Sequence, residues 1–208
     1  LGIAGIITPW NFPIAIPCWK TMPALVTGNT VVFKPSSDTP HCATLLVELM
    51  HEAGFPAGVV NLVTGDGTTG AHLVRNEGID KLAFTGSTEV GKLIMRELAG
   101  RDVRMTLELG GKAANIVFDD AALDQAVEGI VNGIYFNQGH VCCAGSRLLV
   151  QESIYEPLLE KLKRRLSTLR VGDPLDKNTD VGAINSKAQL EKIRELVASG
   201  EEEGAEIY

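Results

Sequence analysis

Apolar runs alternate with amphipathic stretches along the first half of the chain. Five runs are nearly continuous in hydrophobic residues, which is typical of strands buried on both faces. They cover about residues 1–8, 29–36, 57–65, 79–87 and 103–111. The stretches between them repeat apolar side chains on a helical period and predict helices near 13–26, 40–53, 69–76 and 88–98. Repeated strand–helix units of this length predict an α/β fold with a doubly wound parallel sheet.

A second domain is expected after the paired glycines Gly110 and Gly111, which permit a change of chain direction. We place the boundary between residues 109 and 110. The pattern then predicts strands near 113–118 and 146–151 and helices near 123–136, 154–169 and 186–199. The last residues, "SGEEEGAEIY", are expected to begin a further strand.

Composition and charge exclude several classes of protein. Hydrophobic residues make up 45% of the chain, which is enough for a core. No apolar run reaches the ~18 residues of a membrane span. The net charge of -7 argues against a nucleic-acid or anionic-lipid surface. Four cysteines without a CxxC pair argue against a disulfide framework or a zinc site and favour a cytoplasmic setting.

Ligands of doubly wound sheets bind beyond the carboxyl ends of the strands. Two glycine-rich loops lie there. "GDGTTG" (65–70) has the spacing of a dinucleotide fingerprint, but it follows the third strand, and a tight turn beside the ligand is the alternative. In "FTGSTEVG" (84–91), Gly86 turns the chain, Ser87 is placed to cap a helix, and Gly91 lets that helix pack closely. An ordinary helix cap is the alternative there.

Three polar side chains follow strands at the same edge. Lys34 in "FKPS" is placed to reach a ribose hydroxyl or a phosphate, and a solvated lysine is the alternative. Asn11 in "TPWNFP" has an amide that can donate to a developing oxyanion, or it simply forms a turn. Glu108 in "LELGG" lies within an apolar strand end, which suits a general base, or its charge meets water.

The double-cysteine loop, residues 136–146, carries Cys142 and Cys143 side by side. Neighbouring side chains of an extended chain point to opposite sides, so one sulfur is expected to face a cleft while the other packs. A disulfide between adjacent cysteines is strained, which argues against a staple. A nucleophile needs an electropositive setting rich in N–H groups, and the residues alone leave a reactive thiol and buried packing both open.

Five motifs in order resemble the NAD(P)-dependent aldehyde dehydrogenase superfamily. They are "PWNFP", "GNTVVFKPS", "FTGSTEVG", "LELGGKAANIVF" and "FNQGHVCCAGSRLLV", and together they span essentially the whole chain. The resemblance implies a Rossmann-like NAD(P)-binding domain over 1–109, lacking its N-terminal part. It implies the N-terminal portion of a catalytic domain over 110–208. The parent would be a cytoplasmic homo-oligomer that oxidises a small-molecule aldehyde to a carboxylic acid, with NAD or NADP and without a metal.

The same resemblance implies roles for individual residues. Cys142 would be the nucleophile, with Cys143 as its packed neighbour. Asn11 would stabilise the oxyanion, and Glu108 would activate the water that hydrolyses the thioester. The residues implied in cofactor binding are Lys34, Ser37, Gly67, Gly86, Ser87, Trp10 and Leu109. In this assignment "GDGTTG" is not the pyrophosphate site.

Two residues depart from the family pattern. His140 stands where the family usually has Gln, so it either tunes the thiol or fills the space. Ser37 stands where strongly NAD-selective members often carry Glu. A small neutral side chain removes carboxylate–phosphate repulsion, so we expect NADP to be tolerated. The adjacent Asp38 is placed to restore part of that repulsion.

Family members extend further at both ends, and this chain has no initiating Met. Part of the substrate tunnel, the "ExFGP" motif that holds the nicotinamide ribose and the oligomerisation strand belong to those extensions. We therefore expect little or no turnover from these 208 residues alone. A non-catalytic nucleotide-binding or structural module is the alternative, and a redox switch between Cys142 and Cys143 is a third hypothesis.

Overall fold

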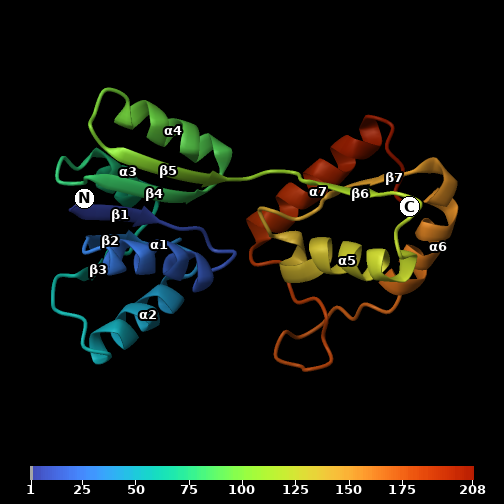
Figure 1. Cartoon of the computed structure of the whole chain (residues 1–208), viewed down its shortest axis with the longest axis horizontal. Coiled ribbons are helices and arrows are strands. Elements are labelled where there is room, and N and C mark those ends of the chain that lie inside the picture. Colours follow the sequence, from blue (N-terminus) through green and yellow to red (C-terminus); the bar gives the residue numbers. More distant parts are fainter. Residues whose placement is uncertain (1) are drawn as a thin grey trace. The chain divides into compact units, whose positions relative to one another are not determined.

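The computed structural model describes residues 2–208 and divides into two compact units (Figure 1). The first unit ends at Gly111, and the second is Lys112–Tyr208. The boundary expected from the sequence, between residues 109 and 110, lies two residues before this division. Each unit has a hydrophobic core of its own.

The first unit is built on a five-stranded sheet in the order β3-β2-β1-β4-β5. Its strands are β1 (Ile3–Ile7), β2 (Thr30–Lys34), β3 (Val60–Leu62), β4 (Lys81–Gly86) and β5 (Arg104–Leu109). All neighbouring strands pair in parallel. The chain moves outward from β1 to β3 and then continues on the other side of β1 with β4 and β5. The predicted doubly wound parallel α/β sheet is confirmed.

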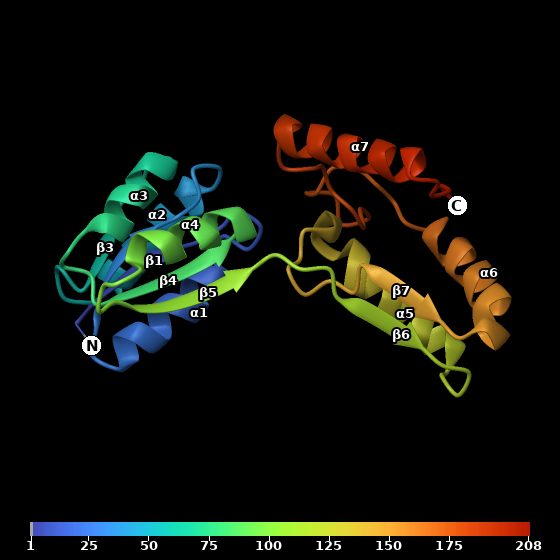
Figure 2. The ribbon, with the colours of Figure 1, turned by 90° about the horizontal axis from the view of Figure 1, so that it is seen from above.

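Four helices cover both faces of this sheet. They are α1 (Ala15–Val26), α2 (Pro40–Glu52), α3 (Gly67–Arg75) and α4 (Thr88–Leu98). Figure 2 shows α1 on one side of the strands and α3 and α4 on the other. Ile6 and Phe33 pack in the cluster that contains α2 residues, whereas Ile7 and Phe84 pack with α3 and α4. Successive residues of a strand face opposite sides of the sheet. Because helices cover both sides, residues at even and at odd positions must both be apolar, which explains the continuous hydrophobic runs.

The second unit contains a strand–helix–strand unit. Its elements are β6 (Ala114–Val117), α5 (Leu123–Tyr135), η1 (Phe136–Gly139), β7 (Arg147–Val150), η2 (Glu152–Ile154), α6 (Tyr155–Leu166) and α7 (Lys187–Glu202). β6 and β7 pair in parallel. Val117 of β6, Ile130 of α5 and Leu158 of α6 meet in its core. Among residues 2–208, none of the helices is both long and apolar enough to cross a bilayer.

The strand expected at the C-terminal tail is not formed. α7 continues to Glu202, three residues past its predicted end, and residues 205–208 have no regular structure. Glutamate continues a helix easily, and Gly204 then ends the turn with a φ of +92°. The N–H of Ala205 donates to the carbonyl of Gly200 at 2.9 Å, which is a typical helix ending.

Phe33 provides a test of the first core, because it has no exposed surface. Phe33→Ala is expected to lower the free energy of unfolding by about 3–5 kcal/mol, since it removes a buried ring and leaves a cavity. Val26→Ala on α1 is the control, because Val26 is 87% exposed, and its change should stay within about 0.5 kcal/mol. Both tryptophans lie in the first unit, so urea denaturation followed by tryptophan fluorescence measures this unit. Equal effects of the two substitutions would contradict the placement of Phe33.

Candidate functional site

The carboxyl ends of three strands lie at one level in the first unit. Ile7 of β1 is in register with Lys34 of β2 and with Phe84 of β4. The strand order reverses between β1 and β4, and doubly wound sheets bind ligands in the crevice at such a reversal. The loop after β1 carries Trp10 and Asn11, so these two candidates stand at the expected edge.

Lys34 is buried at the end of β2, with only 6% of its surface exposed. Burial lowers the pKa of Lys34, and the Asp66 carboxylate partly offsets this shift. The alternative of a fully solvated lysine is therefore wrong. A desolvated ammonium group at the ligand edge suits a ligand that brings a phosphate or hydroxyl oxygen to it.

The N-terminus of α3 is occupied by a side chain. The Asp66 carboxylate accepts from the N–H groups of Thr68 at 2.9 Å and Thr69 at 3.4 Å. These hydrogen bonds lower the pKa of Asp66. A fixed carboxylate at this position repels a second anion, which argues against a pyrophosphate site at "GDGTTG". Gly67 begins the helix, and a Cβ there would meet no atom within 4 Å.

The turn into α4 is sterically tight. A Cβ on Gly86 would collide with the Phe84 ring. The Ser87 hydroxyl accepts from the N–H of Val90 at 3.3 Å, so the predicted cap is confirmed. A Cβ on Gly91 would lie 2.6 Å from a methyl carbon of Leu109, which confirms the predicted close packing of this helix. Leu109 is thereby held at the end of β5 beside the Gly86 turn.

Ser37 lies at an exposed turn tip after β2. The N–H of Thr39 donates to the carbonyl of Ser36 at 3.3 Å, and the N–H of Asp38 donates to the Ser36 hydroxyl at 3.3 Å. Ser37 and Asp38 are both exposed at this turn. Because both side chains are exposed among the described residues, both can face a ligand.

Glu108 is exposed at the end of β5. Among the described residues of the first unit, no apolar side chains enclose it, as the alternative of a charge that meets water predicts for this unit. Lys20 of α1 interacts electrostatically with Glu108. The Lys20 ammonium donates to the carbonyl of Phe84 at 3.4 Å, and burial lowers the pKa of Lys20 while the Glu108 carboxylate opposes the shift.

The sequence interpretation overlooked Lys20. One signal was present, since Lys20 is the only charged residue in the apolar stretch that forms α1. A charged side chain that must be half-buried in such a helix indicates a functional position. Its partner Phe84 lies 64 residues away, so no local pattern identifies the contact.

The second unit carries the double-cysteine loop. Cys142 and Cys143 are both exposed free thiols, so the expectation that Cys143 packs inside was wrong. The reason is local: the N–H of Ala144 donates to the carbonyl of Val141 at 3.1 Å, and the two cysteines form the middle of that turn. The rule that neighbouring side chains alternate holds for extended chain and does not apply to a turn.

Two residues of this loop adopt a strained backbone. Asn137 has a φ of 51° and Gln138 a φ of 55°, and Gly139 follows with a φ of 77°. A residue other than glycine in this left-handed region costs on the order of 1–3 kcal/mol. His140 closes the turn with its N–H, which donates to the carbonyl of Asn137 at 2.9 Å.

The candidate residues divide between the units. Asn11, Glu108 and the cofactor candidates belong to the first unit, and Cys142 belongs to the second. Among residues 2–208, no three His, Cys, Asp or Glu side chains are grouped as a metal site would require.

Comparisons with known proteins identify similar chains. A sequence profile of the aldehyde dehydrogenase family matches residues 1–208. Human retinal dehydrogenase 2 is 52% identical over 210 residues, a match that covers 100% of this chain and 40% of that protein. The rat retinal dehydrogenase 2 gives the same identity and coverage. This chain therefore spans about two fifths of the length of these curated relatives.

Solved structures agree with the fold. The NAD-dependent aldehyde dehydrogenase from Sinorhizobium meliloti has a TM-score of 0.96 at 45% identity, over 99% of this chain and 41% of that one. An NAD+ complex of aldehyde dehydrogenase from Bacillus cereus has a TM-score of 0.95 at 44% identity, over 98% of this chain and 42% of that one.

The buried ammonium of Lys34 predicts a pH dependence of stability. Burial lowers its pKa in the folded state, so the unfolded chain holds more protons between that lowered pKa and the ordinary value of 10.5. Stability should therefore rise with pH through this window. The Lys34→Met variant should have a higher free energy of unfolding than the unchanged chain at pH 7. This difference should vanish at a pH above the ordinary lysine pKa. Urea denaturation between pH 7 and 11, with the exposed Lys92→Met as control, measures this effect, and a Lys34→Met variant that is less stable at pH 7 would contradict it.

Proposed function

Since this chain belongs to the aldehyde dehydrogenase family, we propose that it forms the cofactor-binding part and the nucleophile-bearing part of an enzyme that oxidises an aldehyde to a carboxylic acid. The observation that carries the proposal is the family match over the whole chain, with the double-cysteine motif in register. The parent would act as a cytoplasmic homo-oligomer on a small-molecule aldehyde, with NAD or NADP.

The chemistry of the first unit fits a dinucleotide. Lys34 offers a buried cation for a ribose hydroxyl or phosphate, and Ser37 is exposed beside it. Gly86 and Ser87 lie at the N-terminus of α4, which is capped by a hydroxyl, whereas the N–H groups at the start of α3 already bond to the Asp66 carboxylate. Free N–H groups suit a pyrophosphate better, although Glu89 lies in the first turn of α4. The remaining residues that we assign to the cofactor are Trp10, Gly67 and Leu109. A bound nicotinamide supplies the acceptor for the hydride of the aldehyde.

The residues of this chain would share the reaction as follows. The Cys142 thiolate attacks the aldehyde carbon, and Asn11 donates to the oxyanion that forms. After the hydride leaves, Cys142 holds the acyl group as a thioester. Glu108 takes a proton from water, which attacks the thioester, releases the acid and restores the thiol. The loss of one oxyanion donor typically raises such a barrier by about 2.7–4 kcal/mol.

A nucleotide-binding module without catalysis is the second candidate. The observation that favours it is that Cys142 and its neighbour Cys143 are both exposed free thiols, without a feature among the described residues of the second unit that sets one apart. In this case the first unit would bind NAD(P), and Cys142 would be an ordinary surface thiol.

Alkylation separates the two candidates. We expect iodoacetamide to modify Cys142 faster than the equally exposed Cys143, and we expect NAD or NADP to change the rate at Cys142. Cys142→Ser should abolish the fast phase and Cys143→Ser should leave it in place. Peptide mass spectrometry identifies each site. Equal slow rates at both cysteines, unaffected by the nucleotide, would favour the module, whereas robust steady-state aldehyde oxidation by the 208 residues would refute the expectation of little turnover.

The side chain at position 37 is expected to influence how strongly NADP binds relative to NAD. Ser37→Glu should weaken NADP binding by about tenfold or more while NAD binding changes little, because a carboxylate then faces the 2′-phosphate. Ser37→Gln is the matched control, since it has the same size without the charge. Asp38→Asn should act in the opposite direction and strengthen NADP binding. Isothermal titration of both nucleotides measures these changes, and equal losses in the Glu and Gln variants would contradict a role of charge.

A further inference from the structure

The left-handed run of the double-cysteine loop needs contacts that hold it. Asn137 and Gln138 both have positive φ values, and such backbone persists only where the surroundings fix it. Hydrogen bonds close this run within the loop, among them one from the N–H of His140 to the carbonyl of Asn137 at 2.9 Å and one from the Asn137 amide to the carbonyl of His140 at 3.4 Å. These bonds close the turn on itself but do not engage the Gln138 side chain.

Gln138 connects the loop to Gly182. With its carboxamide turned over, Gln138 accepts from the N–H of Gly182 at 3.3 Å and donates to the carbonyl of Asn137 at 3.0 Å. A Cβ on Gly182 would lie 3.3 Å from the end of the Gln138 carboxamide and 3.3 Å from Pro174. Glycine therefore permits the close approach that this contact needs.

His140 connects the loop to α7. The amide nitrogen of Gln189 and Nε2 of His140 are 3.2 Å apart. An amide nitrogen only donates, so Nε2 accepts and the ring is neutral. Burial lowers the pKa of His140, and Lys112 lowers it further against the opposing hydrogen bond with Asn137. The backbone of Gln189 is fixed in turn, because its N–H donates to the Ser186 hydroxyl that caps α7.

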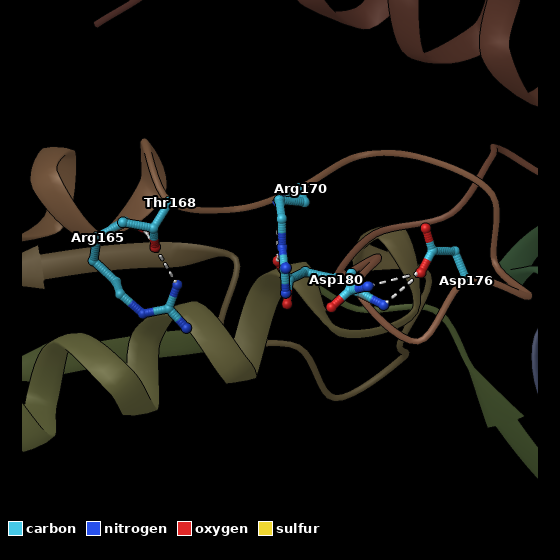
Figure 3. A network of polar contacts seen from close by, with 6 residues as sticks. Arg165, Thr168, Arg170, Asp176 and Asp180 are labelled. Carbon is cyan, nitrogen blue, oxygen red and sulfur yellow. Dashed lines mark hydrogen bonds and ion pairs between the residues drawn. The ribbon is translucent and has the colours of Figure 1, made fainter.

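The segment before Gly182 forms a closed loop without helices or long strands. Arg170 and Asp180 close it, with the Arg170 N–H at 2.9 Å and its guanidinium at 3.2 Å from the Asp180 carboxylate (Figure 3). The N–H of Gly172 and the carbonyl of Val181 add a backbone hydrogen bond of 3.1 Å. Inside the loop, the N–H and the side-chain amide of Asn178 both donate to the Asp176 carboxylate, so hydrogen bonds within the loop also hold this turn. This loop gives Gly182 a fixed position.

We propose that segment 170–189 is a brace that holds the double-cysteine loop in its left-handed turn and thereby positions the Cys142 thiol. Gly182 holds the loop through its hydrogen bond with Gln138, and Gln189 holds it through its contact with His140. His140 is thus a positioning residue, which accounts for the histidine at the place where the family usually has Gln. The consequence for catalysis rests on the proposed role of Cys142 as nucleophile.

Hydrogen exchange of the 208-residue chain tests the brace without reference to catalysis. The N–H groups of His140 and Ala144 are bonded inside the loop and report on it. Gln189→Ala and His140→Ala should each speed hydrogen exchange at these two N–H groups by roughly fivefold. The double variant, with both Gln189→Ala and His140→Ala, should exchange no faster than either single variant. Each substitution removes the same contact between the two side chains. The N–H of Gln151, which bonds to β6, and the control Glu191→Ala on α7 should show no change.

Gly182 is tested in the same way. Gly182→Ala should speed exchange of the loop, since the new methyl group displaces Gln138. Gly129→Ala in α5 is the matched control, because a Cβ there meets no atom within 4 Å. Unchanged exchange in Gln189→Ala or in Gly182→Ala would overturn the brace.

The effect on the thiol is measured as the ratio of alkylation rates at Cys142 and Cys143. We expect His140→Ala and Gln189→Ala to move this ratio toward one, and His140→Gln to restore it, because a carboxamide can again bond to Gln189. Faster exchange with an unchanged ratio would overturn the positioning of Cys142. A ratio of one in the unchanged chain would contradict the proposed function instead, and the exchange experiment would then still decide the brace.

Discussion

The candidate cofactor site depends on the parallel pairing of β1 with both β2 and β4. This pairing sets Ile7 level with Lys34 and with Phe84, so three loops begin at the same edge. The register is strongly fixed, because Ile6 and Ile7 are buried on opposite faces and a slip by one residue would exchange their surroundings. Asn11, Lys34 and the Gly86 turn owe their common position to that constraint.

Two lysines at this edge favour function over stability. Burial lowers the pKa of both Lys34 and Lys20, so the fold holds each cation at a cost. The two helix N-termini at the same edge differ for a similar reason. The Asp66 carboxylate caps α3, whereas the Ser87 hydroxyl caps α4, which carries Glu89 in its first turn. The similar glycine-rich spacing of the two loops therefore conceals two different helix caps.

The sequence predicted the elements well where burial decides them. The strands β1, β2 and β4 are buried on both faces, so their hydrophobic runs are unambiguous, and α4 has the predicted bounds, Thr88–Leu98. The features that escaped prediction depend on partners distant in the sequence or on turn geometry. Lys20 meets a carbonyl of β4, and Cys143 is exposed because the chain turns there. The contact of His140 with Gln189 spans 49 residues, so the role of His140 stayed open in the sequence.

Magnitudes indicate how firmly the double-cysteine loop is held. Two left-handed residues other than glycine cost on the order of 1–3 kcal/mol each. A side-chain hydrogen bond returns only about 1 kcal/mol net. The two contacts through Gln138 and His140 therefore offset only part of the strain, and the loss of either one leaves more of it uncompensated. A loop in that condition responds to the loss of a single contact, as the proposed brace requires.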